Sequence, residues 1–204
     1  MAVDPLKILY AVMEGSRIRD SKGIIPLFGV YLSLFSVEYY NKISFEFERK
    51  MGKKRESEAE KLLIAASQEC GYATFHGIRS SREWEELVVP MIESEEDQIY
   101  GFCAFAMAFG WGDMEIKELI PEERLIIQVS ESYEASGYLA NYGSSKTGKC
   151  YMLRGVAAAF MGLVYGEDYP DGCFSFSAEE TLCRAKGDPY CEFLAQKSQT
   201  GYAV

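Results

Sequence analysis

The most informative segment of this chain is Glu180-Thr-Leu-Cys183-Arg-Ala-Lys-Gly187-Asp-Pro-Tyr-Cys191-Glu-Phe. A carboxylate precedes Cys183 by three residues, and Cys191 follows it across a Gly-Asp-Pro sequence. Glycine, aspartate and proline favour tight turns, so we expect the chain to reverse at Gly187 and to bring the two cysteines together. Two cysteines held across a turn are a disulfide, part of a metal site, or two unrelated core thiols. The choice among these decides what kind of protein this is.

The cysteine content and the N-terminal sequence indicate a reducing compartment. Six cysteines in 204 residues are far fewer than a disulfide-stapled scaffold carries. The first residues, Met1-Ala-Val-Asp-Pro-Leu-Lys7, lack the basic patch, apolar run and small-residue cleavage site of a signal peptide. We therefore expect a cytoplasmic protein with reduced thiols, in which Cys183 and Cys191 are metal ligands rather than a disulfide.

The charge balance argues against two classes of partner. A formal net charge of -10 disfavours direct nucleic-acid binding, which relies on clusters of lysine and arginine. The one basic run, residues 49–55, is followed by Glu56, Glu58 and Glu60, and we interpret it as a solvated helix junction. No stretch approaches 18 uninterrupted apolar residues, so we expect no membrane span.

The first half of the chain carries helical patterns. Apolar residues recur at intervals of three and four, which predicts helices over residues 5–14, 28–39 and 57–70, the last closed by Gly71. The second of these helices is rich in aromatic residues, and we interpret it as facing either the core or a dimer partner. Ser81 is expected to cap a further helix with acidic residues in its first turn.

The second half changes to strand patterns with a helix among them. Residues 124–130, 173–177 and 190–195 are rich in β-branched or alternating residues and are expected as strands. Small residues from Gly155 to Gly162 suit a helix packed tightly against a sheet. Together these patterns predict an α+β fold, with an antiparallel sheet packed against helices and an N-terminal helical extension.

No repeat or low-complexity linker divides the chain. We expect an N-terminal helical extension over residues 1–55, one main domain over residues 56–195, and a flexible tail over residues 196–204. A length of 204 residues with 48% hydrophobic residues is ample for a single core.

The donor set around the Gly-Asp-Pro turn suits tetrahedral zinc. Thiolates and a carboxylate can complete four ligands without histidine, and Glu180, Cys183 and Cys191 supply three of them. The fourth is expected to be Cys150 or Cys173, and spacing alone leaves both open. A site with four protein ligands has no open position for water, so it would be structural rather than catalytic.

Four segments of the chain resemble the 4-vinyl reductase domain family, which is also described as hydrocarbon-binding. They are Cys150-Tyr-Met-Leu-Arg-Gly155, Glu180-x-x-Cys183…Gly187-Asp-Pro-x-Cys191-x-Phe193, Phe109-Gly-Trp-Gly-Asp-Met-Glu-Ile116 and Leu125-Ile-Ile-Gln-Val-Ser-Glu-Ser132. The resemblance covers roughly residues 56–195. The family includes the sensor domains of phenol-responsive transcription activators and a protein associated with bacteriochlorophyll synthesis. It is similar in fold to vesicle-tethering TRAPP subunits.

The resemblance implies a structural zinc ion and a particular set of ligands. Carried over residue by residue, the family's ligands fall on Cys150, Glu180, Cys183 and Cys191. The chain departs from the sensor domains in a longer segment before Glu180, around residues 168–172. An added loop there could bring Cys173 or Glu179 to the metal in place of a family ligand.

The resemblance also implies a buried pocket for a small apolar or aromatic ligand. Its expected lining residues are Phe102, Phe105, Phe109, Trp111, Ile127, Gly155 and Ala159. For any one of these residues, plain core packing is the favoured explanation. The indole N–H of Trp111 could orient a polar group of a ligand. The phenol sensors also place a histidine at the ligand hydroxyl, whereas the single histidine here, His76, is distant in sequence, which argues against phenol itself.

The sequence favours a binding protein over an enzyme. The family name implies reduction of a vinyl group, but the chain has no G-x-G-x-x-G sequence and no P-loop, and Cys70 and Cys103 lie apart from any visible base. We expect a homodimeric small-molecule sensor or carrier that acts through a separate output protein. The alternatives are a tetrapyrrole-pathway reductase or substrate carrier, and a ligand-free adaptor or scaffold.

Overall fold

The computed structural model describes residues 3–18, 20 and 22–198. In this part of the chain the α-helices are α1 (Pro5–Gly15), α2 (Val37–Met51), α3 (Glu56–Arg79), α4 (Arg82–Leu87), α5 (Asp97–Ala108), α6 (Tyr133–Tyr142) and α7 (Tyr151–Tyr165). The strands are β1 (Ile25–Leu27), β2 (Val30–Leu32), β3 (Met114–Ile120), β4 (Arg124–Val129), β5 (Phe176–Leu182) and β6 (Cys191–Lys197). Short 3-10 turns are η1 (Lys53–Arg55), η2 (Val89–Met91), η3 (Asp171–Phe174) and η4 (Arg184–Lys186).

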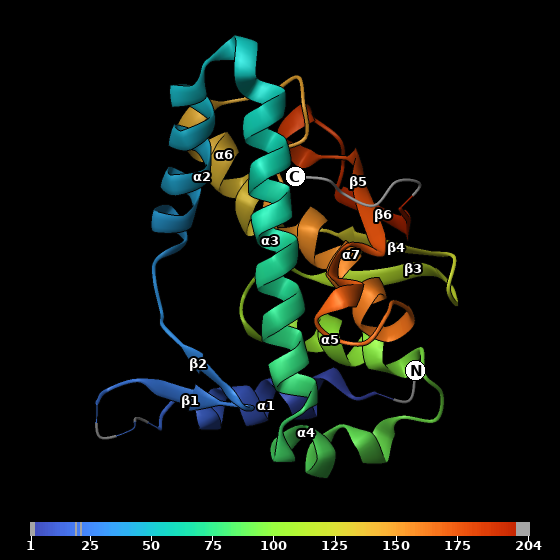
Figure 1. Ribbon diagram of the computed structural model, residues 1–204. Helices are drawn as coiled ribbons and strands as arrows, with labels where there is room; N and C mark the ends of the chain where they lie inside the picture. Colours follow the sequence, from blue (N-terminus) through green and yellow to red (C-terminus); the bar gives the residue numbers. More distant parts are fainter. Residues whose placement is uncertain (1–2, 19, 21, 199–204) are drawn as a thin grey trace.

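The main sheet is antiparallel throughout, with the strand order β3-β4-β6-β5. Helix α7 lies between this sheet and the long helix α3, as Figure 1 shows, and α2 stands on the other side of α3. The predicted α+β fold, with an antiparallel sheet packed against helices and an N-terminal helix, is confirmed. No helix in the described part of the chain is long and apolar enough to cross a membrane.

Helix α7 owes its central position to small residues on both of its faces. Every side chain from Gly155 to Val164 is buried. A Cβ at Gly155 would lie 2.6 Å from the backbone nitrogen of Gln68 and the carbonyl oxygen of Ile64, both on α3. Glycine therefore allows the two helix backbones to cross in direct contact. The expected helix is present, but its closest packing is against α3 rather than the sheet.

The aromatic stretch from Phe28 is not the helix that its spacing predicts. Phe28 and Gly29 both have positive φ values (46° and 73°) and form the turn of the β1–β2 hairpin. Such values are incompatible with a right-handed helix. After β2 the chain runs without regular structure from residue 33 to Ser36, whose hydroxyl caps α2 by accepting from the Tyr39 N–H. The helix begins only there because the turn and the cap override the periodicity.

Two other boundaries differ from the sequence-based expectation. Helix α3 continues past Gly71 to Arg79, because Gly71 lies buried against Val156 of α7 and its lack of a side chain serves packing rather than termination. Cys173 lies in η3 instead of a strand, and β5 starts three residues later. The predicted cap at Ser81 is confirmed, since its hydroxyl accepts from the Trp84 N–H.

The N-terminal segment contributes to the main core. Ile8 and Val12 of α1 are buried in the same cluster as α5 and α7, and the Phe28 ring meets Phe105 edge to face with centroids 4.7 Å apart. At the other end, β6 continues to Lys197, so the sheet takes up the first two residues of the expected tail. Residues 199–204 of that tail lie outside the described residues.

Candidate metal centre and apolar core

Four side chains from three separate parts of the chain converge at one end of the sheet. Cys150 immediately precedes α7, Glu180 lies in β5, Cys183 follows β5, and Cys191 begins β6. One ligand atom from each lies within 4.8 Å of the others, and the three cysteines are fully buried. This cluster could hold a metal ion. It contains the four residues that the resemblance implies.

The chain reversal between Cys183 and Cys191 occurs as predicted. Gly187 adopts a left-handed conformation (φ 100°) at the end of η4, which glycine tolerates without strain. The Asp188 carboxylate accepts the Cys183 N–H at 2.8 Å, and the Cys191 sulfur accepts the Arg184 N–H at 3.4 Å. These bonds fix the two sulfurs on the same side of the turn.

Strand alternation selects Glu180 over its neighbour Glu179. Phe176 and Ala178 are buried on the inner face of β5, and Glu180 follows them by two residues on the same face, whereas Glu179 is exposed. One carboxylate oxygen of Glu180 accepts the Cys150 N–H at 3.1 Å. The other, Oε1, is buried and has no hydrogen-bond partner among the described residues. An orphaned buried carboxylate oxygen is costly unless it meets a cation.

Negative charge is crowded at this cluster. Burial, followed by the neighbouring Cys183, raises the pKa of Glu180 to about 8. Hydrogen bonds from the Cys150 and Cys183 thiols hold the pKa of Cys191 at about 4, while burial raises that of Cys150 well above its ordinary value. The raised pKa values of Glu180 and Cys150 show that burial opposes negative charge on these two groups. A divalent cation would offset that opposition.

The geometry fits zinc. Two sulfurs on a tetrahedral zinc ion, each about 2.3 Å from the metal, lie about 3.8 Å apart. The sulfurs of Cys150 and Cys191 are 3.6 Å apart. If all four side chains bind, the site is closed to water. The donor set also suits other thiophilic metals, so the fit alone does not single out zinc.

The positions of the cysteines decide between the two other arrangements that the sequence left open, a disulfide and a site that includes Cys173. All six cysteines are free thiols, so Cys183 and Cys191 do not form a disulfide. Cys173 packs against α3, where its backbone carbonyl accepts from the Gln68 side chain at 2.7 Å, and it does not belong to the cluster. Burial and the nearby Glu69 raise the pKa of the Cys173 thiol to about 11. The longer loop before β5 therefore does not bring Cys173 to the other cysteines.

A buried ion pair beside the cluster was not foreseen from the sequence. The Lys149 ammonium group, 2% exposed as a residue, donates to Glu48 of α2, and the Tyr151 hydroxyl donates to the same carboxylate at 2.7 Å. Lys149 also lies 3.5 Å from Glu56. A signal was available, because Asn41, Phe45 and Glu48 have helical spacing and form the buried face of α2.

Glu134 is a second buried carboxylate that the sequence did not single out. Its two oxygens accept the backbone N–H groups of Met152 (2.9 Å) and Leu153 (3.1 Å) in the first turn of α7. Burial nevertheless raises its pKa to about 8. The residue anchors α6 to the start of α7, next to Cys150, and thereby holds one wall of the cluster.

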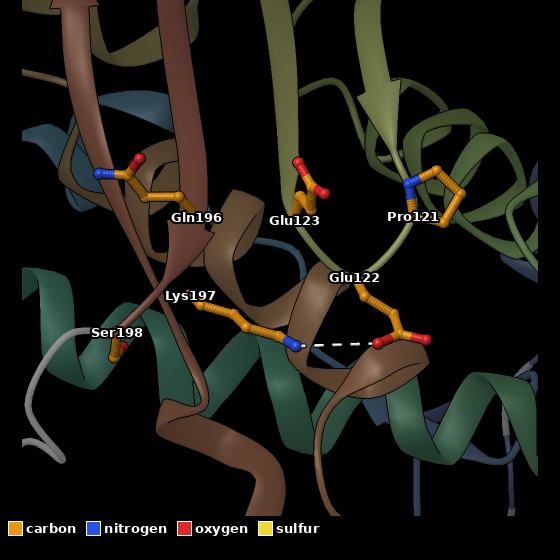
Figure 2. A pocket seen from close by; sticks show the side chains of 6 residues that line it. All are labelled: Pro121, Glu122, Glu123, Gln196, Lys197 and Ser198. Atoms are coloured by element: carbon orange, nitrogen blue, oxygen red, sulfur yellow. Dashed lines mark ion pairs between the residues drawn. The ribbon is translucent and has the colours of Figure 1, made fainter.

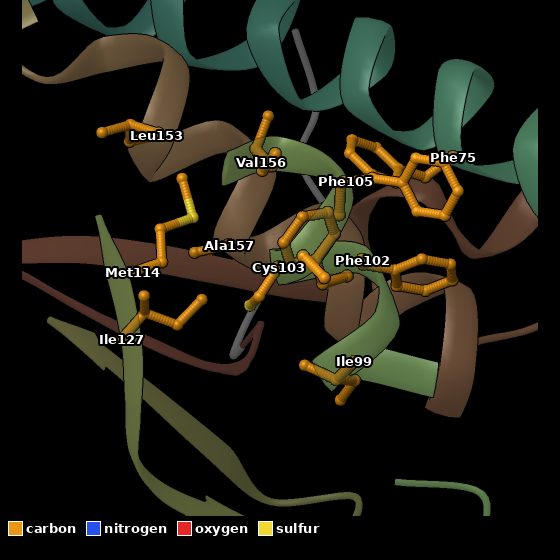
Figure 3. Packing of buried hydrophobic residues seen from close by; sticks show 14 of the residues in the cluster. Phe75, Ile99, Phe102, Cys103, Phe105, Met114, Ile127, Leu153, Val156 and Ala157 are labelled. Carbon is orange, nitrogen blue, oxygen red and sulfur yellow. The ribbon is translucent and has the colours of Figure 1, made fainter. Parts of the chain in front are cut away.

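The apolar core between α7 and the sheet is almost completely filled. Its cavity has a volume of about 10 Å³. Figure 3 shows α7 side chains facing those of the strands across it. The lining residues are Met114, Ile127, Val129, Leu153, Val156, Ala157, Phe160 and Phe193. A space of this size holds about one water molecule, whereas ligand pockets measure about 300–1,000 Å³.

The residues expected to line a ligand pocket lie in three places. Ile127 lines the small cavity. Phe102 and Phe105 are fully buried on α5, and Phe109 and Trp111 are half-buried just beyond it with ring centroids 5.8 Å apart.

Gly155 and Ala159 instead face α3. Gly155 meets the α3 backbone, and the Ala159 methyl group would lie 3.5 Å from a Cβ at Gly71. These two small residues bring helices together and do not face the cavity.

Aromatic rings connect α3, α5 and α7 within this core. Phe75 of α3 meets Phe160 of α7 at 4.7 Å and Trp111 at 6.0 Å between centroids. The next residue, His76, turns away from Trp111 and stacks on Tyr169 at 3.8 Å. The single histidine therefore does not face the Trp111 indole, consistent with its distance along the sequence.

A larger hollow lies at the far end of β6 from the cysteines. It has a volume of about 610 Å³ and is an open surface groove between the β3–β4 turn and the last residues of β6 (Figure 2). Its lining residues are Pro121, Glu122, Glu123, Gln196, Lys197 and Ser198. The ion pair across it, between Lys197 and Glu122, is 3.8 Å long and exposed on both sides. Apart from Pro121 its lining residues are polar or charged, and the groove lies away from the candidate metal centre.

The fold is shared with two proteins of known structure. The chain is similar to the phenol-responsive sensory domain of the transcription activator PoxR, in its crystal structure with phenol. The TM-score is 0.70 with 15% identity, over 93% of this chain and 88% of that domain. It is also similar to trafficking protein particle complex subunit 3 from Naegleria fowleri, covalently bound to palmitic acid. Here the TM-score is 0.54 with 14% identity, over 82% of this chain and 98% of the subunit.

The sequence comparisons are negative. No protein-family model matches the chain, and no curated protein matches it. At 14–15% identity the two structures show a common fold and nothing more. Residues 56–195 are 140 of the 204 residues, so the similarity over 93% of the chain also takes in most of residues 1–55. The expected likeness to phenol sensor domains and TRAPP subunits is thus found at the level of fold.

Proposed function

We propose that the chain is a binding module for a small apolar or aromatic compound, with a structural zinc ion. The observation that carries the proposal is the shared fold, over 93% of the chain, with a sensory domain crystallised with phenol. The second solved neighbour is also described with an apolar group attached, palmitic acid. The proposal assigns no catalytic residue. A sensing role would need a separate protein for its output.

The proposed binding region is the aromatic core between α5, α7 and the sheet. Phe102, Phe105, Phe109 and Trp111 supply aromatic surface, and Ile127 supplies an apolar wall from β4. Trp111 is half-buried, and its indole N–H could donate to a polar group on the ligand. Such a combination of apolar walls with one directed donor is typical of small-molecule sites.

Ligand entry would require the core to open. A cavity of about 10 Å³ cannot hold a compound the size of phenol. Phe109 and Trp111 are the half-buried members of the proposed region, and they lie just outside the end of α5. We infer that this segment moves outward on binding, so that the ligand shifts an equilibrium between a filled and an open core.

The proposed zinc ion would join the start of α7 to strands β5 and β6. Cys150 fixes the start of α7, while Glu180, Cys183 and Cys191 fix β5, β6 and the turn between them. These residues belong to the segments that resemble the 4-vinyl reductase family, and we infer a distant relation to that family on their account. No observation favours a reductase reaction. The metal would stabilise the domain, with the ligand bound elsewhere.

One observation favours a different function, that of a ligand-free adaptor. The filled core is what a scaffold would have, and the second solved neighbour is a subunit of a trafficking complex. The two functions differ in a measurable way. A binding module gains stability from a suitable ligand, and a scaffold does not.

Titration calorimetry with phenol, toluene and palmitic acid tests the proposal. We expect saturable binding of at least one probe and a rise in Tm. If phenol binds, Trp111→Phe should weaken its binding about tenfold and leave toluene binding unchanged, because only phenol can accept from the indole N–H. Tyr10→Phe on α1, an exposed residue outside the proposed region, is the control. Native mass spectrometry of protein purified from its own host extends the search beyond the three probes. Absence of any bound compound there, together with no binding in calorimetry, would favour the adaptor.

A further inference from the structure

The segment between β4 and α6 supports the candidate metal centre without supplying a ligand to it. Residues 131–136 contact both the start of α7 and the turn after β5, the two parts of the chain that carry the cysteine cluster. The most direct contact is made by Ser132, whose hydroxyl oxygen lies 3.2 Å from the sulfur of Cys150. Both residues are fully buried, so water does not compete for this contact.

The direction of the hydrogen bond between Ser132 and Cys150 follows from their other partners. The Ser132 oxygen accepts the Ala135 N–H at 3.3 Å and thereby caps α6, which leaves its own proton free to be donated. Cys150 donates its single proton to the Cys191 sulfur. Ser132 is therefore the donor and Cys150 the acceptor. In the described part of the chain the structure gives this hydroxyl no other acceptor.

Metal binding would strengthen this hydrogen bond. A cysteine binds a metal ion as a thiolate, which has no proton and can only accept. A hydrogen bond to a charged sulfur is also stronger than one to a neutral thiol. Cys191 has a comparable donor, since the Arg184 backbone N–H is directed at its sulfur at 3.4 Å. The two neighbouring sulfurs of Cys150 and Cys191 thus each have a donor in place.

The segment also holds the turn that carries the second donor. The Arg184 guanidinium group donates to Glu131 at 2.5 Å and to Ser136 at 3.2 Å. The Glu131 side chain is mostly exposed, so this ion pair adds little stability. Its effect is geometric, because it ties the residue after Cys183 to the segment between β4 and α6.

The segment is itself fixed to its surroundings. Glu134 accepts the N–H groups at the start of α7, and the Tyr133 N–H donates to the Trp111 carbonyl oxygen at 3.3 Å. A Cβ at Gly112 would overlap the carbonyl oxygen of Glu131, so the two backbones are in direct contact. A side chain that is held in this way on both sides can keep a fixed position beside a metal ligand.

We propose that Ser132 is a positioning residue of the metal centre, which donates a hydrogen bond to the metal-bound sulfur of Cys150. The inference rests on the proposed zinc ion and deepens it, because it assigns the group that orients one of the ligands. Ser132 itself does not bind the metal. Residues that hydrogen-bond to metal ligands orient them and tune the electron density that they give to the metal.

Cobalt(II) in place of zinc tests the proposal, because its thiolate-to-metal charge-transfer absorption reports on the sulfur atoms themselves. We expect Ser132→Ala to lower the affinity for cobalt at least about tenfold, measured by competition with a chelator. The charge-transfer band should shift to longer wavelength, because a sulfur without the hydrogen bond gives up electrons more easily. Ser132→Thr keeps the hydroxyl and the helix cap, and it should restore both the affinity and the band position.

Ser81→Ala is the matched control. Ser81 is also a buried serine that caps a helix, through the Trp84 N–H, but it lies outside the cluster. Its loss should lower the Tm, as the loss of the Ser132 cap does, and leave the cobalt affinity and the band unchanged. An unchanged affinity and band in Ser132→Ala, or equal changes in Ser81→Ala, would overturn this proposal and leave the metal site intact. A wild type that binds neither zinc nor cobalt would refute the metal centre, and the role of Ser132 with it.

Wild-type protein loaded with an NMR-active cadmium isotope provides a test that needs no substitution. The Ser132 hydroxyl is buried, so its proton should exchange slowly with water. We expect that proton to show a scalar coupling to the metal, transmitted through the hydrogen bond and the Cys150 sulfur. A slowly exchanging proton without this coupling would contradict the proposal.

Discussion

The sulfur atoms of Cys150 and Cys191 lie 3.6 Å apart, although 41 positions separate the two residues along the chain. One residue starts α7 and the other starts β6. Their contact joins the central helix to the sheet at the point where Glu180 and Cys183 also converge. A metal ion here would add to the apolar packing between α7 and the sheet and to the hydrogen bond from Arg154 to the Ala178 carbonyl oxygen.

Purified protein should carry about one zinc ion per chain, bound by the four converging residues. Cys191→Ser should reduce the metal content, measured by inductively coupled plasma mass spectrometry, to a small fraction of that value and lower the Tm. Cys173→Ser is the matched control, because Cys173 lies outside the cluster, and it should retain full metal content. Metal-free wild-type protein, or equal losses in both variants, would contradict the assignment.

The buried pair of Lys149 and Glu48 should be strongly coupled. Lys149→Met leaves the Glu48 carboxylate buried with only the Tyr151 hydroxyl as a close donor, which we expect to cost about 3–5 kcal/mol of unfolding free energy. Glu48→Leu should cost a similar amount. The double variant should lose clearly less than the sum of the two, because it leaves no isolated charge. Urea unfolding of all four proteins measures the coupling, and strictly additive losses would refute it.

The crossing of α3 and α7 should be intolerant of a single added methyl group. Gly155→Ala places a carbon 2.6 Å from two backbone atoms of α3, neither of which can move independently of its helix. We expect a loss of about 1–3 kcal/mol, despite the higher helix propensity of alanine. Denaturant unfolding provides the measurement. A neutral or stabilising effect would mean that the two helices are not in direct backbone contact.

Local signals account for what the sequence predicted correctly. Turn chemistry at Gly187, the Ser81 cap and the β-branched run of β4 depend on neighbouring residues, and the structure has each of them. Spacing could not choose Cys150 over Cys173, since that choice depends on how α7 and β5 pack. The resemblance to a family supplied that long-range information.

The small residues on α7 show what local sequence signals could not predict. The resemblance implies that Gly155 lines a ligand pocket, and in the structure the missing side chain of this residue allows the crossing of α3 and α7. The sequence gives the size of each side chain, but it does not show which element packs into the space beside a small residue. The Phe28 turn was missed for a related reason, because its aromatic neighbours kept a helical spacing across a hairpin.

His76 makes the unfolding free energy of the protein depend on pH. Burial and the nearby Arg79 charge lower the pKa of this histidine, whose ring lies flat on Tyr169. The unfolded chain therefore binds a proton at about pH 6.5, before the folded chain does. The contribution of His76 to the unfolding free energy should fall as the pH drops below that value, because at this residue the unfolded state then binds more protons. Glu134 and Glu180, whose pKa values are raised to about 8, act in the opposite direction.

His76→Phe keeps a ring over Tyr169 and removes the titration. The wild type should therefore lose unfolding free energy relative to the variant as the pH falls from 7.5 to 5. If the wild type is the more stable protein at pH 7.5, the two free energies should converge. If the variant is the more stable, the difference between them should grow. Because His76 is the single histidine and other groups titrate in both proteins, the difference between them isolates its contribution. Urea unfolding at several pH values measures this difference. A difference that does not change with pH would show that His76 has the same pKa in both states.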